Sequence, residues 1–269
     1  MKISKPLASA HRQALDLVHS DRPLNYEDRL FVIENYHEGA THINGLAGAF
    51  FTPMSLARDF AINVGGGDQR RIVDLCAGSG RLGFAIDWEG RHTELTCVEI
   101  NPEYVLVGRR VLPHAEWILA DCTEAALRLP AHFDFAVSNP PFGRVATRGK
   151  TQGRYTGPEM EFRVIDAASR IARHGAFILP QASCPFRYSG KPTYERVANA
   201  KYEGFRAETG IDLDIGVAVD TAAYRAEWRG TNPICEIVVC DFNPQNDACQ
   251  SLPPERGVPG PVPRQLELV

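Results

Sequence analysis

From residue 70 onward, short apolar runs of strand length alternate with segments of helical periodicity, and this alternation constrains the fold more than any other feature. Successive parallel strands need a crossover connection, which such helices supply. The pattern predicts a three-layer α/β fold whose mainly parallel, Rossmann-like sheet is covered on both faces. The expected strands are Arg71–Leu75, Glu94–Glu99, Ala115–Leu119, Phe133–Ser138 and Gly175–Leu179, and the expected helices are Leu82–Trp88, Glu103–Leu112, Thr123–Leu129 and Glu159–Arg173.

The residues before this alternation have a helical pattern. Apolar positions recur with helical spacing over residues 5–19 and 24–36, so we expect a helical N-terminal extension spanning residues 1–45. A further helix is expected at Met54–Val64, inside a main domain spanning residues 46–242.

The residues after position 180 break the alternation. A helical stretch to about Tyr202 is followed by two strand-like runs, Leu213–Val219 and Ile234–Asp241, with no obvious helix between them. Two consecutive strands predict an antiparallel pair closing the edge of a seven-stranded sheet. From Asn243 the chain is rich in proline and poor in apolar residues, so we expect a flexible tail over residues 243–269.

Composition narrows the class of protein. The 269 residues, 44% of them hydrophobic, suffice for one substantial core, and no apolar run approaches the roughly 18–20 residues that a membrane span needs. The N-terminus has no signal-peptide apolar region. The seven cysteines contain no C-x-x-C pair, which favours free thiols in a reducing compartment over disulfides or a zinc site. We expect a cytoplasmic protein with no membrane partner and no metal.

The run from Ile72 to Gly80 reads as a buried strand entering a glycine turn at the start of a helix, which is where a small-molecule cofactor binds in such folds. The spacing of Gly78, Gly80 and Gly83 also satisfies the G-x-G-x-x-G dinucleotide fingerprint. Asp74 favours a different ligand, because a carboxylate there would oppose a pyrophosphate and attract a positively charged sulfonium amino acid. The dinucleotide and a purely structural turn remain alternatives.

Two further carboxylates follow the next strands. Glu99 ends the second expected strand, where it can accept both hydroxyl protons of a ribose, although a solvated strand-end acid is the alternative. Asp121 follows the third, where it can accept from an adenine amino group. Both positions fit a nucleoside cofactor at the carboxyl edge of the sheet.

The tetrapeptide Asn139-Pro140-Pro141-Phe142 leaves the carboxyl end of the fourth expected strand and continues to Gly143; we call residues 139–143 the catalytic loop. The two prolines restrict the backbone, so the Asn139 side chain is aimed rather than mobile. If Asn139 Oδ1 and the Pro140 carbonyl accept the two protons of a conjugated amino group, its lone pair can turn toward a methyl donor. Phe142 offers a face on which a flipped-out base stacks. A simple turn is the alternative interpretation.

Phe51-Thr52-Pro53, the glycine loop, Glu99, Asp121 and the tetrapeptide occur in an order that resembles the amino-group DNA methyltransferases, especially the adenine-N6 class. The similarity covers roughly residues 50 to 180. It implies S-adenosyl-L-methionine as cofactor, a solitary enzyme acting on double-stranded DNA, and a cofactor role for Phe51, Thr52 and Pro53. Phe142 departs from the tyrosine most frequent there. The candidate cofactor-binding residues are Phe51, Thr52, Pro53, Asp74, Cys76, Ala77, Gly78, Gly80, Glu99, Ile100, Asp121, Cys122 and Asn139.

The tetrapeptide is also similar to those of enzymes that methylate ribosomal RNA bases or a glutamine of release factors. DNA adenine is our first choice, with ribosomal or transfer RNA as the alternative and a non-enzymatic binding module as a third. The net charge of −4 excludes a wholly basic surface, yet between Arg144 and Arg206 there are 12 Lys and Arg against 5 Asp and Glu. We expect nucleic-acid contacts from insertions near 143–158 and 184–210, namely from Arg144, Arg148, Lys150, Arg154, Arg187, Tyr188 and Lys191. A solvated loop is the alternative for the first insertion.

Two further partners are expected. The N-terminal helices suit packing on a second copy, because a two-fold dimer matches a palindromic DNA site. The C-terminal residues Gln265–Val269 resemble the peptides by which bacterial DNA-processing enzymes dock on the replication sliding clamp, with Val269 where those peptides usually carry Phe. A tail without a partner is the alternative.

Overall fold

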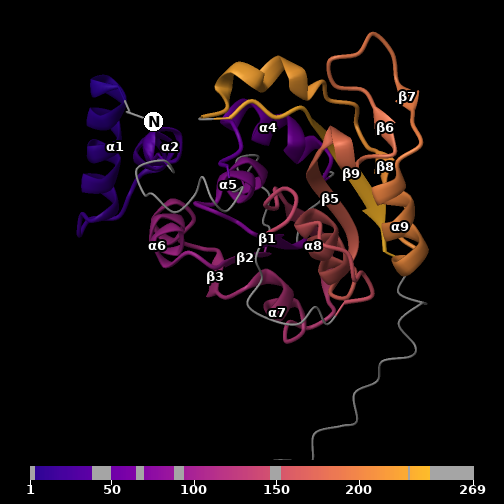
Figure 1. The fold of residues 1–269 in the computed structure, drawn as a ribbon. Helices are drawn as coiled ribbons and strands as arrows, with labels where there is room; N and C mark the ends of the chain where they lie inside the picture. The colour runs from indigo at the N-terminus through magenta and orange to yellow at the C-terminus, as the bar shows by residue number, and fades with distance from the viewer. Residues whose placement is uncertain are drawn as a thin grey trace, which may run out of the picture.

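A computed structural model describes residues 4–37, 50–64, 70–87, 94–145, 153–229 and 231–242 of the chain. Its centre is a seven-stranded sheet of order β3-β2-β1-β4-β5-β9-β8 (Figure 1). The strands are β1 (Arg71–Leu75), β2 (Glu94–Glu99), β3 (Glu116–Leu119), β4 (Phe133–Ser138), β5 (Ala172–Pro180), β8 (Asp214–Ile215) and β9 (Cys235–Asp241). The first five pair in parallel, so the predicted α/β class and five of its strands are confirmed, with small shifts at their ends.

Helices cover both faces of the sheet. One face carries α4 (Met54–Ile62), α5 (Arg81–Asp87) and α6 (Pro102–Val111), and the other carries α7 (Cys122–Ala126), α8 (Met160–Ala168) and α9 (Ala200–Thr209). The side chains of β5 alternate between the two hydrophobic clusters: Ala176 and Ile178 join the first, Phe177 and Leu179 the second. This alternation follows from the two-residue period of a strand and makes both faces apolar.

The two N-terminal helices, α1 (Lys5–Val18) and α2 (Tyr26–Asn35), lie against α6 at one end of the sheet (Figure 1). A capping box between Asn25 and Asp28 starts α2. Arg110 of α6 donates to the carbonyls of Ser20 and Arg22, at 3.0 and 2.6 Å, which holds the turn between the helices on the domain. The predicted helical extension is therefore confirmed and shares the hydrophobic cluster of α4, α5 and α6.

The far end of the sheet departs from expectation in two ways. The helix expected to end near Tyr202 instead begins at Ala200, because the Asn199 side chain caps it, accepting from the Lys201 and Tyr202 amides. The residues before it form a hairpin, β6 (Phe186–Arg187) with β7 (Glu195–Arg196). The strand expected over Leu213–Val219 is only Asp214–Ile215, and the 3₁₀ helix η3 (Thr221–Glu227) follows where no helix was expected.

The Asn63 side chain explains the early end of β8. Its Oδ1 accepts from the Val217 amide at 2.6 Å and its Nδ2 donates to the Val217 carbonyl at 3.4 Å, so these groups do not continue the ladder. The predicted antiparallel pair is nevertheless confirmed, because β9 runs antiparallel to both β8 and β5. No described helix has the length and apolar character that crossing a membrane requires.

Candidate active site

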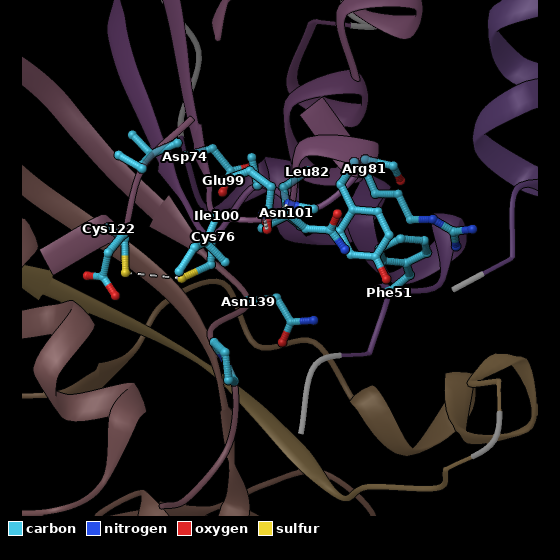
Figure 2. A pocket seen from close by; sticks show the side chains of 18 of the residues that line it. Phe51, Asp74, Cys76, Arg81, Leu82, Glu99, Ile100, Asn101, Cys122 and Asn139 are labelled. Atoms are coloured by element: carbon cyan, nitrogen blue, oxygen red, sulfur yellow. Dashed lines mark hydrogen bonds between the residues drawn. The ribbon is translucent and has the colours of Figure 1, made fainter. Parts of the chain in front are cut away.

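A cavity of about 690 Å³ opens at the carboxyl ends of β1, β2 and β4 (Figure 2). In open α/β sheets, ligands bind at the carboxyl edge, at the point where the order of the strands along the chain reverses. In this sheet the reversal lies at β1, between β2 and β4. Most of the predicted cofactor residues are brought together here, whereas Pro53 and Gly80 do not line the cavity. The lining includes Phe51, Thr52, Asp74, Cys76, Ala77, Gly78, Glu99, Ile100, Asp121, Cys122 and Asn139.

The glycine loop between β1 and α5 is held close to β2. The amides of Cys76 and Ala77 both donate to the Val98 carbonyl, at 3.0 and 2.9 Å. Gly80 has φ of 93°, a conformation that side chains with a Cβ rarely adopt, and Cys76 is the one described non-glycine residue with positive φ, at 75°. The strand-to-helix turn therefore depends on left-handed backbone at these positions.

Glu99 fastens the glycine loop to the end of β2. Its Oε2 accepts from the Gly78 amide and its Oε1 from the Asn101 amide, each at 2.8 Å. Burial raises the pKa of Glu99, and these amide hydrogen bonds partly counter that rise. Each carboxylate oxygen retains a further acceptor position, so the two ribose hydroxyls predicted for this residue have acceptors available.

Asp74 is buried, with 1% of its surface exposed, and lines the same cavity. Neither of its carboxylate oxygens has a hydrogen-bond partner of normal geometry among the described residues. Burial, and then the charge of Glu99, raise the pKa of Asp74 to about 8, while the backbone of Gly83 offsets this slightly. A cationic ligand in the cavity would satisfy this carboxyl group and favour its ionised form.

Asn139 lies on the opposite side of the cavity from Glu99 and between Cys76 and Phe51 in the view of Figure 2. Its Nδ2 donates to the Phe50 carbonyl and to Thr52 Oγ1, both at 3.0 Å. Its Oδ1 is buried and has no partner among the described residues. Because the two donors of the amide are used and the acceptor is not, the site is prepared to receive an N–H group.

The rest of the catalytic loop is arranged around this amide. Ser138, fully buried, donates its hydroxyl to the Leu75 carbonyl and so joins the end of β4 to the end of β1. Pro141 lines the cavity, followed by Val145 and Met160. Phe142 is half-buried against the cluster of α4, α5 and α6, so its predicted stacking on a base stays a prediction.

Asp121 has a structural task beside the one predicted for it. Its Oδ1 accepts from the Thr123 amide at 2.8 Å and caps α7. Next to it, the Cys122 and Cys76 sulfur atoms lie 3.4 Å apart. That contact and burial raise the pKa of Cys76 well above its usual range, which makes the thiol unreactive.

All six cysteines in the described residues are free thiols, as expected; Cys249 lies outside them. Three or more His, Cys, Asp or Glu side chains are nowhere gathered to bind a metal ion in the described part of the chain.

Sequence reasoning missed Arg81, the first residue of α5. Its Nη1 donates to the Thr52 carbonyl at 2.9 Å, and its guanidinium lies 5.3 Å from the centroid of the Phe51 ring, which in turn packs edge-on against Tyr104. These contacts couple the Phe51-Thr52-Pro53 segment to the glycine loop. The signal in the sequence was an arginine directly after Gly80, at the start of the helix, and the structure buries this side chain.

The residues predicted to contact nucleic acid have different surroundings. Arg144, Arg187 and Lys191 are exposed and Tyr188 is half-buried. Arg154 is tied to the domain instead, since its Nε lies 3.1 Å from Asp166 Oδ1 and its Nη2 donates to Ser169 at 2.7 Å. Arg148 and Lys150 lie outside the described residues, as do the whole tail over 243–269 and its Gln265–Val269 peptide.

The sheet order decides between the two cofactor classes. The dinucleotide-binding fold has its sixth strand beside the fifth and parallel to it. Here β9 runs antiparallel between β5 and β8. A candidate class I S-adenosylmethionine-dependent methyltransferase from Listeria monocytogenes is similar in structure, with a TM-score of 0.57 and 12% identity over 93% of this chain and 83% of that one. The chain has the class I methyltransferase fold.

Comparison by sequence agrees with this fold. Residues 55–173 match the family Methyltransferase small domain. A release factor glutamine methyltransferase from Clostridium botulinum is 31% identical over 81 residues, which are 28% of this chain and 29% of that protein. The chain thus spans less than a third of that relative's length. The methyltransferase subunit of a type I restriction-modification system from Streptococcus thermophilus shares the fold, with a TM-score of 0.53, 17% identity and coverage of 79% and 49% of the two chains.

The fold and the family match together imply S-adenosylmethionine as the methyl-donor cofactor. The cavity residues fit it on three counts: a buried carboxyl group without a partner at Asp74, a carboxylate with free acceptor positions at Glu99, and an unpaired acceptor at Asn139. These findings support S-adenosylmethionine-dependent methyl transfer.

Proposed function

We propose that this protein transfers a methyl group from S-adenosylmethionine to the N6 amino group of adenine in double-stranded DNA. The observation that carries the proposal is the buried, unpartnered Oδ1 of Asn139, in one cavity with the carboxyl groups of Asp74 and Glu99. A reaction at an amino group requires a hydrogen-bond acceptor such as Asn139 Oδ1 that points into the cofactor cavity.

The catalytic loop acts on the acceptor nitrogen by position. The lone pair of an exocyclic amino group is conjugated with its ring, which makes the nitrogen a poor nucleophile. Asn139 Oδ1 and the Pro140 carbonyl accept hydrogen bonds from its two N–H groups. These bonds orient the lone pair toward the cofactor side of the cavity. When bound, S-adenosylmethionine supplies an electrophilic methyl carbon on its sulfonium. Pro140 and Pro141 keep the loop rigid, so little reorganisation accompanies the reaction.

The remaining cavity residues hold the cofactor. Asp74 faces its cationic amino-acid part, and Glu99 accepts from the ribose hydroxyls. Asp121 accepts from the adenine amino group. Phe51 and Thr52 line the cavity, and Pro53, which lies outside the lining, begins α4 directly after them. Cys76, Ala77 and Gly78, with Ile100 and Cys122, complete the lining, and Gly80, outside it, provides the turn into α5.

DNA is favoured as the acceptor by two features. The order of the motifs resembles the adenine-N6 DNA enzymes, and exposed basic residues follow the catalytic loop, at Arg144, and the end of β5, at Arg187 and Lys191. A base inside a duplex is out of reach of this cavity, so the proposal requires the adenine to be flipped out, with Phe142 as the candidate ring on which it stacks.

A glutamine amide is the second candidate, favoured by the sequence similarity to release factor glutamine methyltransferases. An amide nitrogen also carries two N–H bonds and a conjugated lone pair. Asn139 and Pro140 therefore suit a glutamine amide and an adenine amino group equally well. The surface around the cavity must discriminate between a protein and DNA.

Incubation with methyl-labelled cofactor and separate pools of DNA, RNA and release factors tests the proposal. We expect label in DNA, recovered as N6-methyladenine after digestion, and none with Asn139→Ala. Label only in RNA or only in a release factor glutamine overturns the DNA assignment. Cofactor binding without label in any pool favours a binding module.

We also propose two partners, a second copy of the chain through the N-terminal helices and the sliding clamp through Gln265–Val269. A tethered peptide at the end of a Pro-rich tail raises the local concentration of the enzyme at its DNA. A peptide covering residues 258–269 should bind purified clamp, and its Leu266→Ala, Leu268→Ala version should not. Equal signals from the two peptides reject the clamp, and a monomer in light scattering rejects the dimer.

A further inference from the structure

The catalytic loop is bonded to α8 at its last residue. Gly143, with φ of 76°, donates its amide to Glu161 Oε2 at 2.7 Å, and its carbonyl accepts from the Met160 amide at 2.8 Å. Both backbone groups of Gly143 are therefore held by the first turn of α8. A loop that carries two prolines has few amides of its own with which to fix its end.

Glu161 is a buried carboxylate whose two oxygens serve different elements. It is 1% exposed, and its Oε1 accepts from the Ser183 hydroxyl at 2.7 Å. Ser183 belongs to η2 (Gln181–Ser183), directly after β5. The side chain thus joins the loop after β4 to the turn after β5, at the cavity edge of the sheet.

The surroundings favour a carboxylate at this position. A buried charge is costly unless hydrogen bonds and nearby dipoles compensate it. Glu161 receives two hydrogen bonds and lies in the first turn of α8, where the helix dipole favours negative charge. The group is fully engaged with the loop and η2, and the reaction described above does not use it.

We propose that Glu161 is a positioning residue that sets the placement of the Asn139 amide through Gly143. The inference rests on the proposed function of the catalytic loop. The loop is held at its start by Ser138 and by the Asn139 Nδ2 contacts, and at its end by Glu161. With the end released, Asn139 Oδ1 loses its alignment with the acceptor nitrogen, while the cofactor contacts at Asp74 and Glu99 are unchanged.

The first test is kinetic. In Glu161→Ala we expect kcat to fall about 100-fold, the order of effect of a 1 Å misplacement, with cofactor Kd by calorimetry within about twofold of wild type. Glu161→Gln should recover most of kcat, because its oxygen accepts from Gly143 and its amide donates to the Ser183 hydroxyl. The kcat of Ser183→Ala should lie between the values for Glu161→Ala and Glu161→Gln.

The control is Asp134→Ala. Asp134 lies at the opposite end of β4, and its carboxylate also accepts a backbone amide, that of Arg71, at 2.9 Å. This variant is expected to lose stability while kcat stays within about twofold of wild type. An equal fall of kcat in Asp134→Ala and Glu161→Ala overturns the positioning role, because the effect would then be general destabilisation.

The second test is independent of activity. Amide hydrogen exchange of Gly143, followed by NMR, should become at least about tenfold faster in Glu161→Ala and stay unchanged in Asp134→Ala. Unchanged exchange in Glu161→Ala overturns the inference. If wild-type protein methylates none of the acceptor pools, the proposed function fails, and the exchange measurement still decides whether Glu161 holds the loop.

Discussion

At the residue scale, Asp74 and Asn139 both bury side-chain oxygens that have no normal hydrogen-bond partner in the described part of the chain. An unsatisfied buried polar atom costs about 1–3 kcal/mol, so folded proteins contain few of them outside functional sites. In this chain the two residues lie beside the carboxyl ends of the neighbouring strands β1 and β4 and line one cavity. A ligand with a positive charge near Asp74 and an N–H group near Asn139 would satisfy both.

The Asn139 amide can be tested by Asn139→Ala. We expect methyl transfer to fall by at least about 100-fold, because alignment of the acceptor nitrogen is lost. Cofactor Kd should rise only a few-fold, since the lost Nδ2 contacts to Phe50 and Thr52 loosen one wall of the cavity. Single-turnover kinetics and calorimetry measure the two effects. A variant that keeps more than about a tenth of the rate removes Asn139 from its proposed role.

The Asp74 carboxyl group predicts a pH dependence. Between its ordinary pKa of 3.8 and about 8, the folded protein holds a proton on Asp74 that the unfolded chain has released. The contribution of this group to stability therefore declines as pH rises through that window. A cationic cofactor favours the ionised form, so cofactor binding should release a proton and tighten as pH rises toward 8.

Calorimetry in buffers of different ionisation enthalpy measures the proton release, and denaturation between pH 5 and 8 measures the stability. Asp74→Asn should lower the proton release and flatten the stability profile. Proton uptake on binding, or an unaltered profile in Asp74→Asn, contradicts the assignment.

At the element scale, small residues set how closely helices lie on the sheet. Gly108 is inside α6, and a Cβ added there would lie 2.1 Å from the Trp117 ring of β3. Gly204 is inside α9, and a Cβ there would have no atom within 4 Å. Both are glycines in a helix interior, where alanine is intrinsically favoured by about 0.5–1 kcal/mol.

These two glycines give a matched prediction for the free energy of unfolding. Gly204→Ala should stabilise the protein by about 0.4–1 kcal/mol, through the lower entropy of the unfolded chain. Gly108→Ala should destabilise it by about 1–3 kcal/mol or more, because the Trp117 ring must move within a packed cluster. Denaturant titration measures both, and effects of the same sign would show that the packing of α6 on β3 is looser than described.

At the scale of the whole molecule, segments far apart in sequence cover the two ends of the sheet. The N-terminal helices pack on α6 at one end of the sheet, and the hairpin β6–β7 lies at the other (Figure 1). Arg229, near the end of η3, donates to the Tyr36 carbonyl at 3.1 Å and so joins the C-terminal part to α2. Of the exposed basic residues, Arg187 and Lys191 belong to the β6–β7 hairpin, and Arg144 directly follows the catalytic loop.

Neutralising Arg144, Arg187 and Lys191 together should weaken DNA binding and reduce the dependence of log K on log salt by about one unit per lost contact. Cofactor affinity should not change. The matched control neutralises Lys5, Arg12 and Arg128, which are exposed on α1 and just after α7. Equal salt slopes for the two triple variants would place the DNA-binding surface elsewhere.

The sequence alone determined the α/β class, the strands at the centre of the sheet, and the carboxyl and amide groups that line the cavity. Strand periodicity and the glycine turn are local signals, and the carboxyl ends of parallel strands meet at one edge wherever such a sheet forms. Asp74, Glu99 and Asn139 could be predicted because each lies at or beside the carboxyl end of a strand.

Contacts between distant residues decided the rest. Only the tertiary structure showed that Asn63 ends β8, that Arg154 pairs with Asp166, and that Glu161 holds Gly143. It also decided that the G-x-G-x-x-G match belongs to a methyltransferase sheet, since the insertion of β9 between β5 and β8 is a long-range pairing. Hydrogen bonds between residues far apart in the chain leave no periodic signal in the sequence, because their geometry exists only once the elements are packed.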